Sequence, residues 1–239
     1  MPEKPAASIG GLTALLLVGG LGTRLRPLTY RVPKPLIRIR GKPFIFYVLK
    51  KLASCGVRNC LLLTGYKHLA VKSYCKNGSR WGMRIAYSRE SKPLGTGGAL
   101  LYAKGKPLST FLALNGDSYV DINLDKFMEF HRKSQALATV YSMRGSLQDR
   151  GAIKAAKNGR VIRFLEKQKS GEGWFNTGAY LMEPQALSLL AKKFKGAFSL
   201  EREGFPLLIK SGKLFAFRGS GRFLDMGSFE SLKKAGSLL

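Results

Sequence analysis

The chain has 239 residues, enough to bury the core of one generously sized domain. Its 41 lysine and arginine residues against 14 aspartate and glutamate residues give a formal charge of +27. Because the basic residues are scattered, this charge indicates a surface property and argues against a dedicated nucleic-acid-binding tract. The three cysteines, Cys55, Cys60 and Cys75, lack metal-site spacing and predict buried free thiols in a reducing compartment.

Strand-like and helix-like segments alternate through the first half of the chain. Short apolar runs predict core strands, and apolar residues at helical spacing predict the helices between them. We expect strands at 13–18, 60–63, 83–87 and 111–114, each followed by a helix, at 44–53, 68–74, 97–103 and 124–134. This order predicts an α/β fold with a Rossmann-like, mostly parallel central sheet, flanked by helices and joined by right-handed crossovers.

The second half has a different character and predicts a smaller β-rich lobe. Strand-like segments lie at 138–142, 152–156, 161–165 and 178–182, with a hairpin turn at 157–160 and helices at 184–194 and 228–235. The sequence contains no linker, internal repeat or low-complexity tract. We therefore expect a single domain over 1–239, with halves of about 1–135 and about 136–239.

The apolar run at residues 9–18, with Lys4 before it, allows two interpretations. It superficially resembles a secretory signal peptide. We favour a first core strand, because cleavage near Gly19 or Gly20 would destroy the glycine-rich turn that follows. No run is long and apolar enough to span a bilayer, so we expect a cytoplasmic protein.

A glycine-rich turn follows the first predicted strand: Gly19-Gly20-Leu21-Gly22-Thr23-Arg24. At the carboxyl end of a buried strand, such a turn lets backbone N–H groups converge on an anion. Thr23 adds a hydroxyl donor and Arg24 a planar cationic fork that suits phosphate. The string is neither a P-loop, which needs a lysine after its last glycine, nor a dinucleotide fingerprint, whose third glycine is replaced by Leu25. We expect this loop to wrap a polyphosphate.

The turn and six further pieces resemble the sugar-1-phosphate nucleotidylyltransferases, the family that makes nucleotide sugars. The pieces follow in the family's order: Pro33-Lys34-Pro35, Leu94-Gly95-Thr96-Gly97-Gly98-Ala99, Asn115-Gly116-Asp117, Phe164-Leu165-Glu166-Lys167, Asn176-Thr177-Gly178-Ala179-Tyr180 and Phe223-Leu224-Asp225-Met226-Gly227. The resemblance covers nearly the whole chain from about Thr13. It implies a nucleotide-binding half and a metal-completing half that contains a β-rich sugar-binding lobe. Some members carry a C-terminal β-helix domain, which we do not expect in a chain of this length.

The resemblance implies that Asp117 and Asp225 hold Mg²⁺, which needs one or two carboxylates and several waters. Asp117 directly follows an apolar strand, so its carboxylate is expected to point into the cleft at the edge of the sheet. The alternatives are an Asx-type turn or helix cap at Asp117, and a cap of the last helix at Asp225. Because the two aspartates occur as a pair, we favour the metal site.

Four residues are implied to be catalytic: Arg24, Lys34, Asp117 and Lys167. Arg24 and the loop N–H groups would hold the β- and γ-phosphates, and Lys167 would hold and orient the sugar phosphate. Lys34 lies between two prolines, which restrict the backbone, so we expect a stiff, extended segment that projects its ammonium at a fixed place. By resemblance, Lys34 contacts the phosphates near the reacting phosphorus; a solvent-facing lysine is the alternative.

The resemblance also implies the two binding pockets. The nucleotide pocket would comprise Gly19, Gly20, Gly22, Thr23, Arg24, Lys34, Gly95, Thr96 and Asp117, with Gly95 and Thr96 against the base and ribose. The sugar pocket would comprise Gly151, Glu166, Lys167 and Asn176, with Glu166 accepting hydrogen bonds from sugar hydroxyls. Two positions depart from the family pattern: Gln168 stands where proline is usual, and Thr177 where alanine is usual.

The implied reaction is nucleotidyl transfer, in which a sugar 1-phosphate oxygen attacks the α-phosphorus of a nucleoside triphosphate and pyrophosphate leaves. This nucleophile is already an anion near neutral pH, so catalysis would be positioning and electrostatics without a general base. Residues 94–99 and 198–206 look closest to short mannose or heptose 1-phosphate guanylyltransferases. We therefore predict GTP with D-glycero-D-manno-heptose 1-phosphate, or next with mannose 1-phosphate. A thymidylyl-, uridylyl- or cytidylyltransferase is the alternative.

Two interpretations from other functional classes remain open. A degenerate fold could serve as a regulatory or binding partner, although all the metal and phosphate residues of the family pattern are present. A basic nucleic-acid-binding protein would rest on the net charge of +27 alone, and predicts strongly salt-dependent affinity for DNA or RNA. The sequence does not indicate whether the protein is a monomer or a homo-oligomer.

Overall fold

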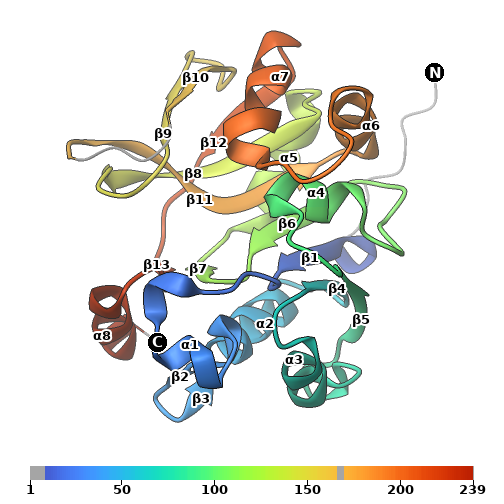
Figure 1. Cartoon of the computed structure of the whole chain (residues 1–239). Coiled ribbons are helices and arrows are strands. Elements are labelled where there is room, and N and C mark those ends of the chain that lie inside the picture. Colours follow the sequence, from blue (N-terminus) through green and yellow to red (C-terminus); the bar gives the residue numbers. More distant parts are fainter. Residues whose placement is uncertain (1–8, 166–169, 239) are drawn as a thin grey trace.

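The computed structural model describes residues 9–165 and 170–238 (Figure 1). The first half contains β1 (Thr13–Leu17), α1 (Leu28–Arg31), β2 (Arg38–Ile39), β3 (Lys42–Pro43), α2 (Phe44–Ser54), β4 (Asn59–Thr64), α3 (His68–Cys75), β5 (Arg84–Arg89), α4 (Gly95–Leu101), β6 (Phe111–Asn115), β7 (Ser118–Val120) and α5 (Leu124–Lys133). The second half contains β8 (Ala138–Ser146), β9 (Ala152–Ala155), β10 (Val161–Leu165), β11 (Glu172–Met182), α6 (Pro184–Lys193), α7 (Phe205–Lys210), β12 (Leu214–Arg218), β13 (Phe223–Asp225) and α8 (Phe229–Leu238).

A nine-stranded sheet organises the molecule. Its main path runs β10-β9-β11-β6-β1-β4-β5, and β8 pairs with both β11 and β12. Strand β1 is parallel to its neighbours β4 and β6, so that Leu15 lies between Leu61 and Ala113. Strand β5 continues the parallel part, and β11 joins β6 in the antiparallel sense. The predicted α/β fold with a mostly parallel central sheet is confirmed, and the parallel strands all end at one edge.

Two apolar layers cover the two faces of this sheet. Successive side chains of a strand point to opposite faces, so Leu16 of β1 belongs to one layer and Leu15 to the other. The layer with Leu16 includes Leu49 of α2, Val71 of α3 and Phe127 of α5, while α4, α6 and α7 contribute to the second layer. Each fully buried leucine or phenylalanine stabilises the fold by roughly 1.5–3 kcal/mol.

The second half forms a β-rich lobe around β8 and β11. The hairpin turn predicted at 157–160 connects β9 to β10, which pair in the antiparallel sense. The Gly159 carbonyl accepts a hydrogen bond from the Ala216 N–H at 2.8 Å, which brings this hairpin back against β12. In Figure 1 the hairpin and α7 lie at the opposite end of the molecule from α2 and α3.

The sequence-based prediction misses several short elements. Strands β7 and β13 have three residues each, too few for a period of two to show. Strand β12 is also missed, and only the second half of β11 is predicted. The helix expected at 97–103 begins instead at Gly95. Among the described residues, no helix combines the length and apolar character needed to cross a bilayer.

Candidate active site

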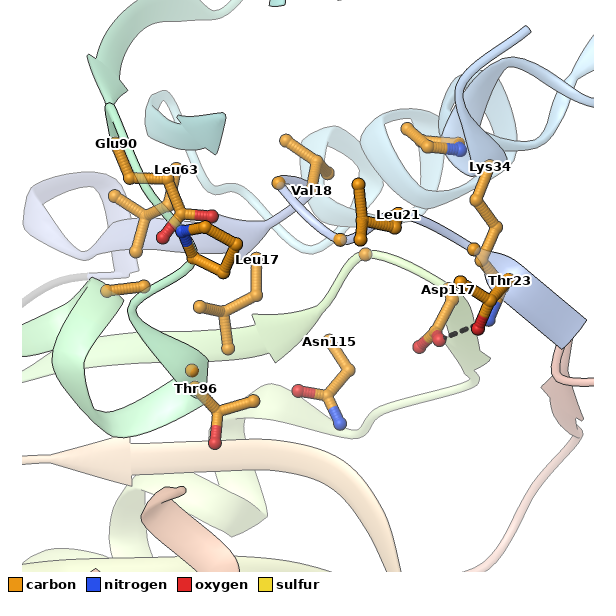
Figure 2. A pocket seen from close by; sticks show the side chains of 18 of the residues that line it. Leu17, Val18, Leu21, Thr23, Lys34, Leu63, Glu90, Thr96, Asn115 and Asp117 are labelled. Carbon is orange, nitrogen blue, oxygen red and sulfur yellow. Dashed lines mark hydrogen bonds and ion pairs between the residues drawn. The ribbon is translucent and has the colours of Figure 1, made fainter. Parts of the chain in front are cut away.

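Two cavities meet at the edge of the sheet where the parallel strands end. The larger has a volume of about 400 Å³ and is lined by residues at the ends of β1, β4 and β6, by Glu90 just after β5, by the glycine-rich turn and by the start of α4. The smaller has a volume of about 170 Å³. Arg24, Asn115 and Asp117 line both cavities, so the two cavities adjoin at these side chains. Figure 2 shows the larger cavity, with Asn115 between Thr96 and Asp117.

The glycine-rich turn forms one wall of the larger cavity and is held from behind. Gly22 has a φ of 64°, and a Cβ there would lie 2.8 Å from Cγ2 of Thr29. The Thr29 hydroxyl donates to the Gly22 carbonyl at 3.0 Å, and the Tyr66 N–H donates to the Gly19 carbonyl at 3.0 Å. A Cβ on Gly19 would lie 2.6 Å from Oε1 of Glu90. The positive φ therefore favours glycine at Gly22, and a side chain at Gly19 would crowd the backbone nitrogen of Gly65, 3.0 Å from the added Cβ, as well as the Glu90 carboxylate.

The start of α4 forms the facing wall. Gly95 has a φ of 70°, and a Cβ there would lie 2.5 Å from the Phe198 carbonyl oxygen. The Thr96 hydroxyl accepts from the Leu200 N–H at 2.8 Å and donates to Oε2 of Glu201 at 2.6 Å. Both predicted residues thus line the larger cavity, while the Thr96 hydroxyl is bonded to protein groups.

Asp117 and Asp225 are brought together by a two-stranded antiparallel sheet outside the main one. In the register of β7 and β13, Asp225 pairs with Ser118, the residue that follows Asp117. The Met226 N–H also donates to the Asp117 carbonyl at 2.8 Å. Asp225 is therefore the last residue of a strand and does not cap α8, because the Ser228 hydroxyl accepts from the N–H of Ser231 at 3.2 Å.

The charges of these two carboxylates influence each other. Burial alone would raise the pKa of Asp117, but the ammonium of Lys34 and the guanidinium of Arg24 hold that pKa below its ordinary value. Burial raises the pKa of Asp225, and the negative charge of Asp117 raises it further. Lys34, Arg24 and Arg150 lower the pKa of Asp225, but they do not outweigh burial and the charge of Asp117.

Lys34 is buried against Asp117. Its Nζ lies 2.5 Å from Oδ2 of Asp117, and its side chain is only 11% exposed. The solvent-facing alternative for this lysine is thus wrong. The segment is less extended than we expected, since Lys34–Leu36 forms a short 3-10 helix after an extended Pro33. Pro35 fits there because an amide in the first turn of a helix needs no partner within the helix.

Arg24 lies in the short 3-10 helix Thr23–Leu25, directly after the glycine-rich turn. A Cβ on Gly227 would lie 3.0 Å from Nη1 of Arg24 and 2.8 Å from Oδ2 of Asp225. The guanidinium and the second aspartate therefore approach the same glycine, at the place where the two cavities meet.

The smaller cavity lies where Gly151 and the middle of β11 come together. Gly151 and Asn176 both line it, and the Asn176 N–H donates to the Gly151 carbonyl at 2.8 Å. Oδ1 of Asn176 accepts from the Gly178 N–H at 2.9 Å, and its Nδ2 donates to the Tyr180 hydroxyl at 2.8 Å. These bonds fix which way the amide faces. The predicted residues Glu166 and Lys167 lie outside the described residues.

The prediction misses several residues that line the cavities, among them Glu90, Asn115, Arg150 and Glu201. Glu90 directly follows β5, and its position at the carboxyl end of a predicted strand could have marked it. Oδ1 of Asn115 is buried and has no hydrogen-bond partner within the described parts of the chain. Burial raises the pKa of Glu90, although a hydrogen bond from the Leu94 N–H opposes the rise.

Asp117 and Asp225 are the residues in this site that could hold a metal ion. Over residues 9–165 and 170–238, no group of three or more His, Cys, Asp or Glu side chains is placed to bind one. Mg²⁺ needs fewer protein ligands, because water and substrate phosphates complete its shell. The two carboxylates therefore fit Mg²⁺ bound together with phosphate better than a closed structural metal site.

Known proteins of similar sequence match nearly the whole chain. The mannose-1-phosphate guanylyltransferase of Mycobacterium tuberculosis is 34% identical over 222 residues, which are 91% of this chain and 61% of that protein. The mannose-1-phosphate guanyltransferase of Saccharomyces cerevisiae is 32% identical over 224 residues, 90% of this chain and 61% of that protein. The chain thus spans about three fifths of the length of these curated relatives.

The fold matches solved structures of similar size. HddC from Yersinia pseudotuberculosis superposes with a TM-score of 0.81 and 27% identity, covering 95% of this chain and 99% of that one. A structure of HddC complexed with GMP-PN superposes with a TM-score of 0.79 and 26% identity, over the same shares of both chains. The family model described as nucleotidyl transferase matches residues 13–239. Because this match spans the central sheet and both cavities, the chain belongs to the nucleotidyl transferase family.

Proposed function

We propose that the protein transfers a nucleotidyl group from a nucleoside triphosphate to a sugar 1-phosphate and releases pyrophosphate. The observation that carries this proposal is the meeting of two cavities at Arg24 and Asp117, with Asp225 beside them. The cavity of about 400 Å³ takes the triphosphate, and the cavity of about 170 Å³ takes the sugar. The reacting phosphorus then lies at the junction, where the positive charges gather.

The residues at the junction act by position and charge. The N–H groups of Gly19, Gly20 and Gly22 and the side chains of Thr23 and Arg24 bind the β- and γ-phosphates. Lys34 holds a positive charge beside the α-phosphate, where negative charge is concentrated as the attacking anion approaches. Gly95 and Thr96 lie against the base and ribose. Gly151, Glu166, Lys167 and Asn176 bind the sugar 1-phosphate, and Lys167 orients its phosphate.

We assign Asp117 and Asp225 as the protein ligands of Mg²⁺. The adjacent carboxylates and the raised pKa of Asp225 support this assignment, because a bound cation would relieve the repulsion between them. When bound, Mg²⁺ supplies positive charge to the phosphates and to both carboxylates.

The position of Glu90 supports guanine as the base. Its carboxylate lines the larger cavity beside Gly19, and its Oε2 accepts a hydrogen bond from the Leu94 N–H at 3.1 Å. A carboxylate accepts hydrogen bonds and donates none, so it suits the N1–H and N2–H₂ donors of guanine. Adenine lacks the N1–H donor. The Glu90 carboxylate therefore favours GTP over ATP.

Relatives support the choice of sugar. The curated relatives of M. tuberculosis and S. cerevisiae are described as acting on mannose 1-phosphate, and HddC has been crystallised with GMP-PN. We propose D-glycero-D-manno-heptose 1-phosphate or mannose 1-phosphate as the acceptor.

The proposed location is the cytoplasm, because the substrate is a nucleoside triphosphate and the three cysteines are free. In the proposed single domain, the nucleotide-binding residues precede about residue 135 and the sugar-binding residues follow it.

The test is pyrophosphate release measured over a panel of triphosphates, each combined with several sugar 1-phosphates. Release that needs both GTP and a manno-configured sugar 1-phosphate supports the proposal. Release with dTTP, UTP or CTP instead would overturn the choice of base and leave the reaction class standing. Nucleotide binding without release indicates a degenerate binding protein, and salt-dependent DNA or RNA binding that competes with GTP indicates a nucleic-acid-binding protein.

A further inference from the structure

A continuous chain of hydrogen bonds joins the two cavities through the protein interior. Oγ1 of Thr96 donates to Oε2 of Glu201 at 2.6 Å, and Oε1 of Glu201 accepts from the Tyr180 hydroxyl at 2.9 Å. The Tyr180 oxygen in turn accepts from Nδ2 of Asn176 at 2.8 Å. Thr96 lines the larger cavity, whereas Asn176 and Glu201 line the smaller one. Tyr180 is fully buried, and it is the link between Asn176 and Glu201.

An irregularity in β11 brings Asn176 and Tyr180 together. Asn176 pairs with Ser142 of β8 and Tyr180 pairs with Val140, so residues 177 to 179 stand opposite a single residue of β8. Both side chains therefore leave the sheet on the same face, and the Tyr180 hydroxyl reaches back to the amide four residues earlier. Gly178 permits this arrangement with a φ of 79°, because a Cβ there would lie 2.6 Å from Nδ2 of Asn115.

The Thr96 end of the chain is anchored to the wall of the nucleotide cavity. Thr96 accepts from the Leu200 N–H at 2.8 Å, and the Phe198 carbonyl accepts from the Gly97 N–H at 3.0 Å. Phe198 also donates its own N–H to the Leu94 carbonyl at 3.0 Å. The start of α4 and the segment carrying Glu201 are thus bonded to each other, so a shift of Glu201 displaces the wall that Gly95 and Thr96 form.

Tyr180 keeps its proton in this environment. Burial raises its pKa well above the ordinary value, and the negative charge of Glu201 raises it further. The hydroxyl therefore always donates to Glu201 and accepts from Asn176. With Oδ1 of Asn176 bonded to the Gly178 N–H, the second hydrogen of Nδ2 remains for a ligand in the smaller cavity.

We propose that Tyr180 is a positioning residue that couples the two cavities, so that a sugar 1-phosphate bound at Asn176 and Glu201 strengthens nucleotide binding at the start of α4. This inference rests on the proposed function, because it assumes that the cavities take two different substrates. By thermodynamic linkage, the nucleotide strengthens sugar binding by the same factor. Two anions in adjacent cavities repel each other directly, so favourable coupling has to be supplied by bound Mg²⁺ or by the protein, and only the protein's share depends on Tyr180.

The test compares Tyr180→Phe with the wild type. The ring remains to pack against Phe205, 5.3 Å away between ring centroids, and only the oxygen is lost. We expect the KM for the sugar 1-phosphate to rise about 10-fold, with kcat changed less than about threefold. Calorimetry then measures the affinity for a non-hydrolysable GTP analogue with and without saturating sugar 1-phosphate. In the wild type the sugar 1-phosphate should tighten binding of the analogue at least about fivefold, and in the variant less than about twofold.

Tyr141→Phe is the matched control. Tyr141 is also buried in the β-rich lobe, and its hydroxyl donates to the Ser220 carbonyl at 3.1 Å, so this variant likewise loses one buried hydroxyl. We expect its KM and its coupling to match the wild type. If the KM and the coupling changed equally in both variants, the loss of any buried hydroxyl in this part of the protein would explain the result, and the proposal would be overturned.

A second variant tests the chain of hydrogen bonds from its Thr96 end, and it keeps the proposal testable if Tyr180→Phe does not fold. Thr96 does not line the smaller cavity, yet Thr96→Val should raise the KM for the sugar 1-phosphate several-fold, because Glu201 loses a hydrogen bond. An active wild type with unchanged sugar KM in both variants overturns the coupling alone. A wild type that binds neither ligand and releases no pyrophosphate overturns the proposed function as well.

Discussion

The two cavities differ in what their walls are made of. Five of the residues that line the larger one are glycines, and a Cβ at Gly19 or Gly95 would lie within 2.6 Å of another atom. Polar and charged side chains line the smaller one, among them Arg150, Asn176 and Glu201, which come from three separate segments. Added bulk should therefore damage the first cavity, and loss of a functional group should damage the second. Asp117 belongs to both cavities.

The largest expected effect lies at this shared residue. Asp117→Asn removes the charge that pairs with Lys34 and that is assigned to Mg²⁺. We expect the activation free energy to rise by about 2–4 kcal/mol and kcat to fall accordingly, which is the loss typical of one preorganised electrostatic group. Steady-state pyrophosphate release with Mg²⁺ measures this. Asp125→Asn, at an exposed position in α5, is the control. Near-normal turnover of Asp117→Asn would refute the role given to Asp117.

Glu90→Gln tests whether the carboxylate that follows β5 at the wall of the larger cavity selects the base. The amide oxygen of a glutamine can still accept from the Leu94 N–H, but the NH₂ group then replaces the second carboxylate oxygen and donates, which suits adenine better than guanine. We expect the ratio of kcat/KM for GTP to that for ATP to fall, by a factor that corresponds to about 1–3 kcal/mol of discrimination free energy. An unchanged ratio would show that the backbone, and not Glu90, recognises the base.

Gly95→Ala tests the sensitivity of the larger cavity to bulk. Its φ of 70° disfavours any side chain, and the new Cβ would lie 2.5 Å from the Phe198 carbonyl oxygen. Gly105→Ala is the matched control, with a φ of 74° and no atom within 4 Å of the new Cβ. Backbone strain costs each variant about 1–2 kcal/mol in urea unfolding. We expect only Gly95→Ala also to raise the KM for GTP.

Asn176→Ala tests the opposite sensitivity in the smaller cavity. It removes the donor to the Tyr180 hydroxyl and the acceptor for the Gly178 N–H, and adds no bulk. We expect the KM for the sugar 1-phosphate to rise by the factor that corresponds to about 1 kcal/mol of binding free energy, the typical net value of a hydrogen bond. GTP affinity measured without the sugar should stay constant. A change confined to GTP affinity would contradict the assignment of this cavity.

The smallest expected effect concerns stability and pH. Burial, and then the charge of Asp117, raise the pKa of Asp225 in the folded protein. The ionised carboxylate therefore destabilises the fold above this raised pKa, and the penalty fades as the pH falls through it. Asp225→Asn should have a higher Tm than the wild type at neutral pH, and the difference should shrink in acid.

Mg²⁺ adds a second readout to the comparison at Asp225. A cation that binds the folded state raises its stability, so Mg²⁺ should raise the Tm of the wild type. It should have little effect on Asp225→Asn, which retains one of the two carboxylates. Equal shifts in both proteins would place the ion elsewhere.

The contrast between the cavities also explains what the sequence could predict. The glycine-rich turn lies in one continuous segment after a buried strand, so its place at the edge of the sheet follows from local pattern alone. Gly95 and Thr96, in contrast, are assigned to the nucleotide pocket from a family motif and not from local pattern, which predicts the helix to begin two residues later. The α/β class follows from the alternation of apolar strands and helices in the first half.

The rest depends on contacts between distant segments. Glu201 reaches Thr96 only because its segment packs on the start of α4, and no local pattern shows this. The irregular pairing of β11 hides the relation between Asn176 and Tyr180, since a simple period of two would not bring them into contact. Strand β13 is too short to predict, so the pairing of Asp117 with Asp225 came from resemblance and not from geometry.

The small sheet formed by β7 and β13 has a consequence for newly made molecules. The glycine-rich turn and the strand that ends at Asn115 emerge from the ribosome well before β13 is translated. The two carboxylates that we assign to Mg²⁺ therefore come from opposite halves of the sequence. The proposed metal site is complete only once β13 has been made and has paired with β7.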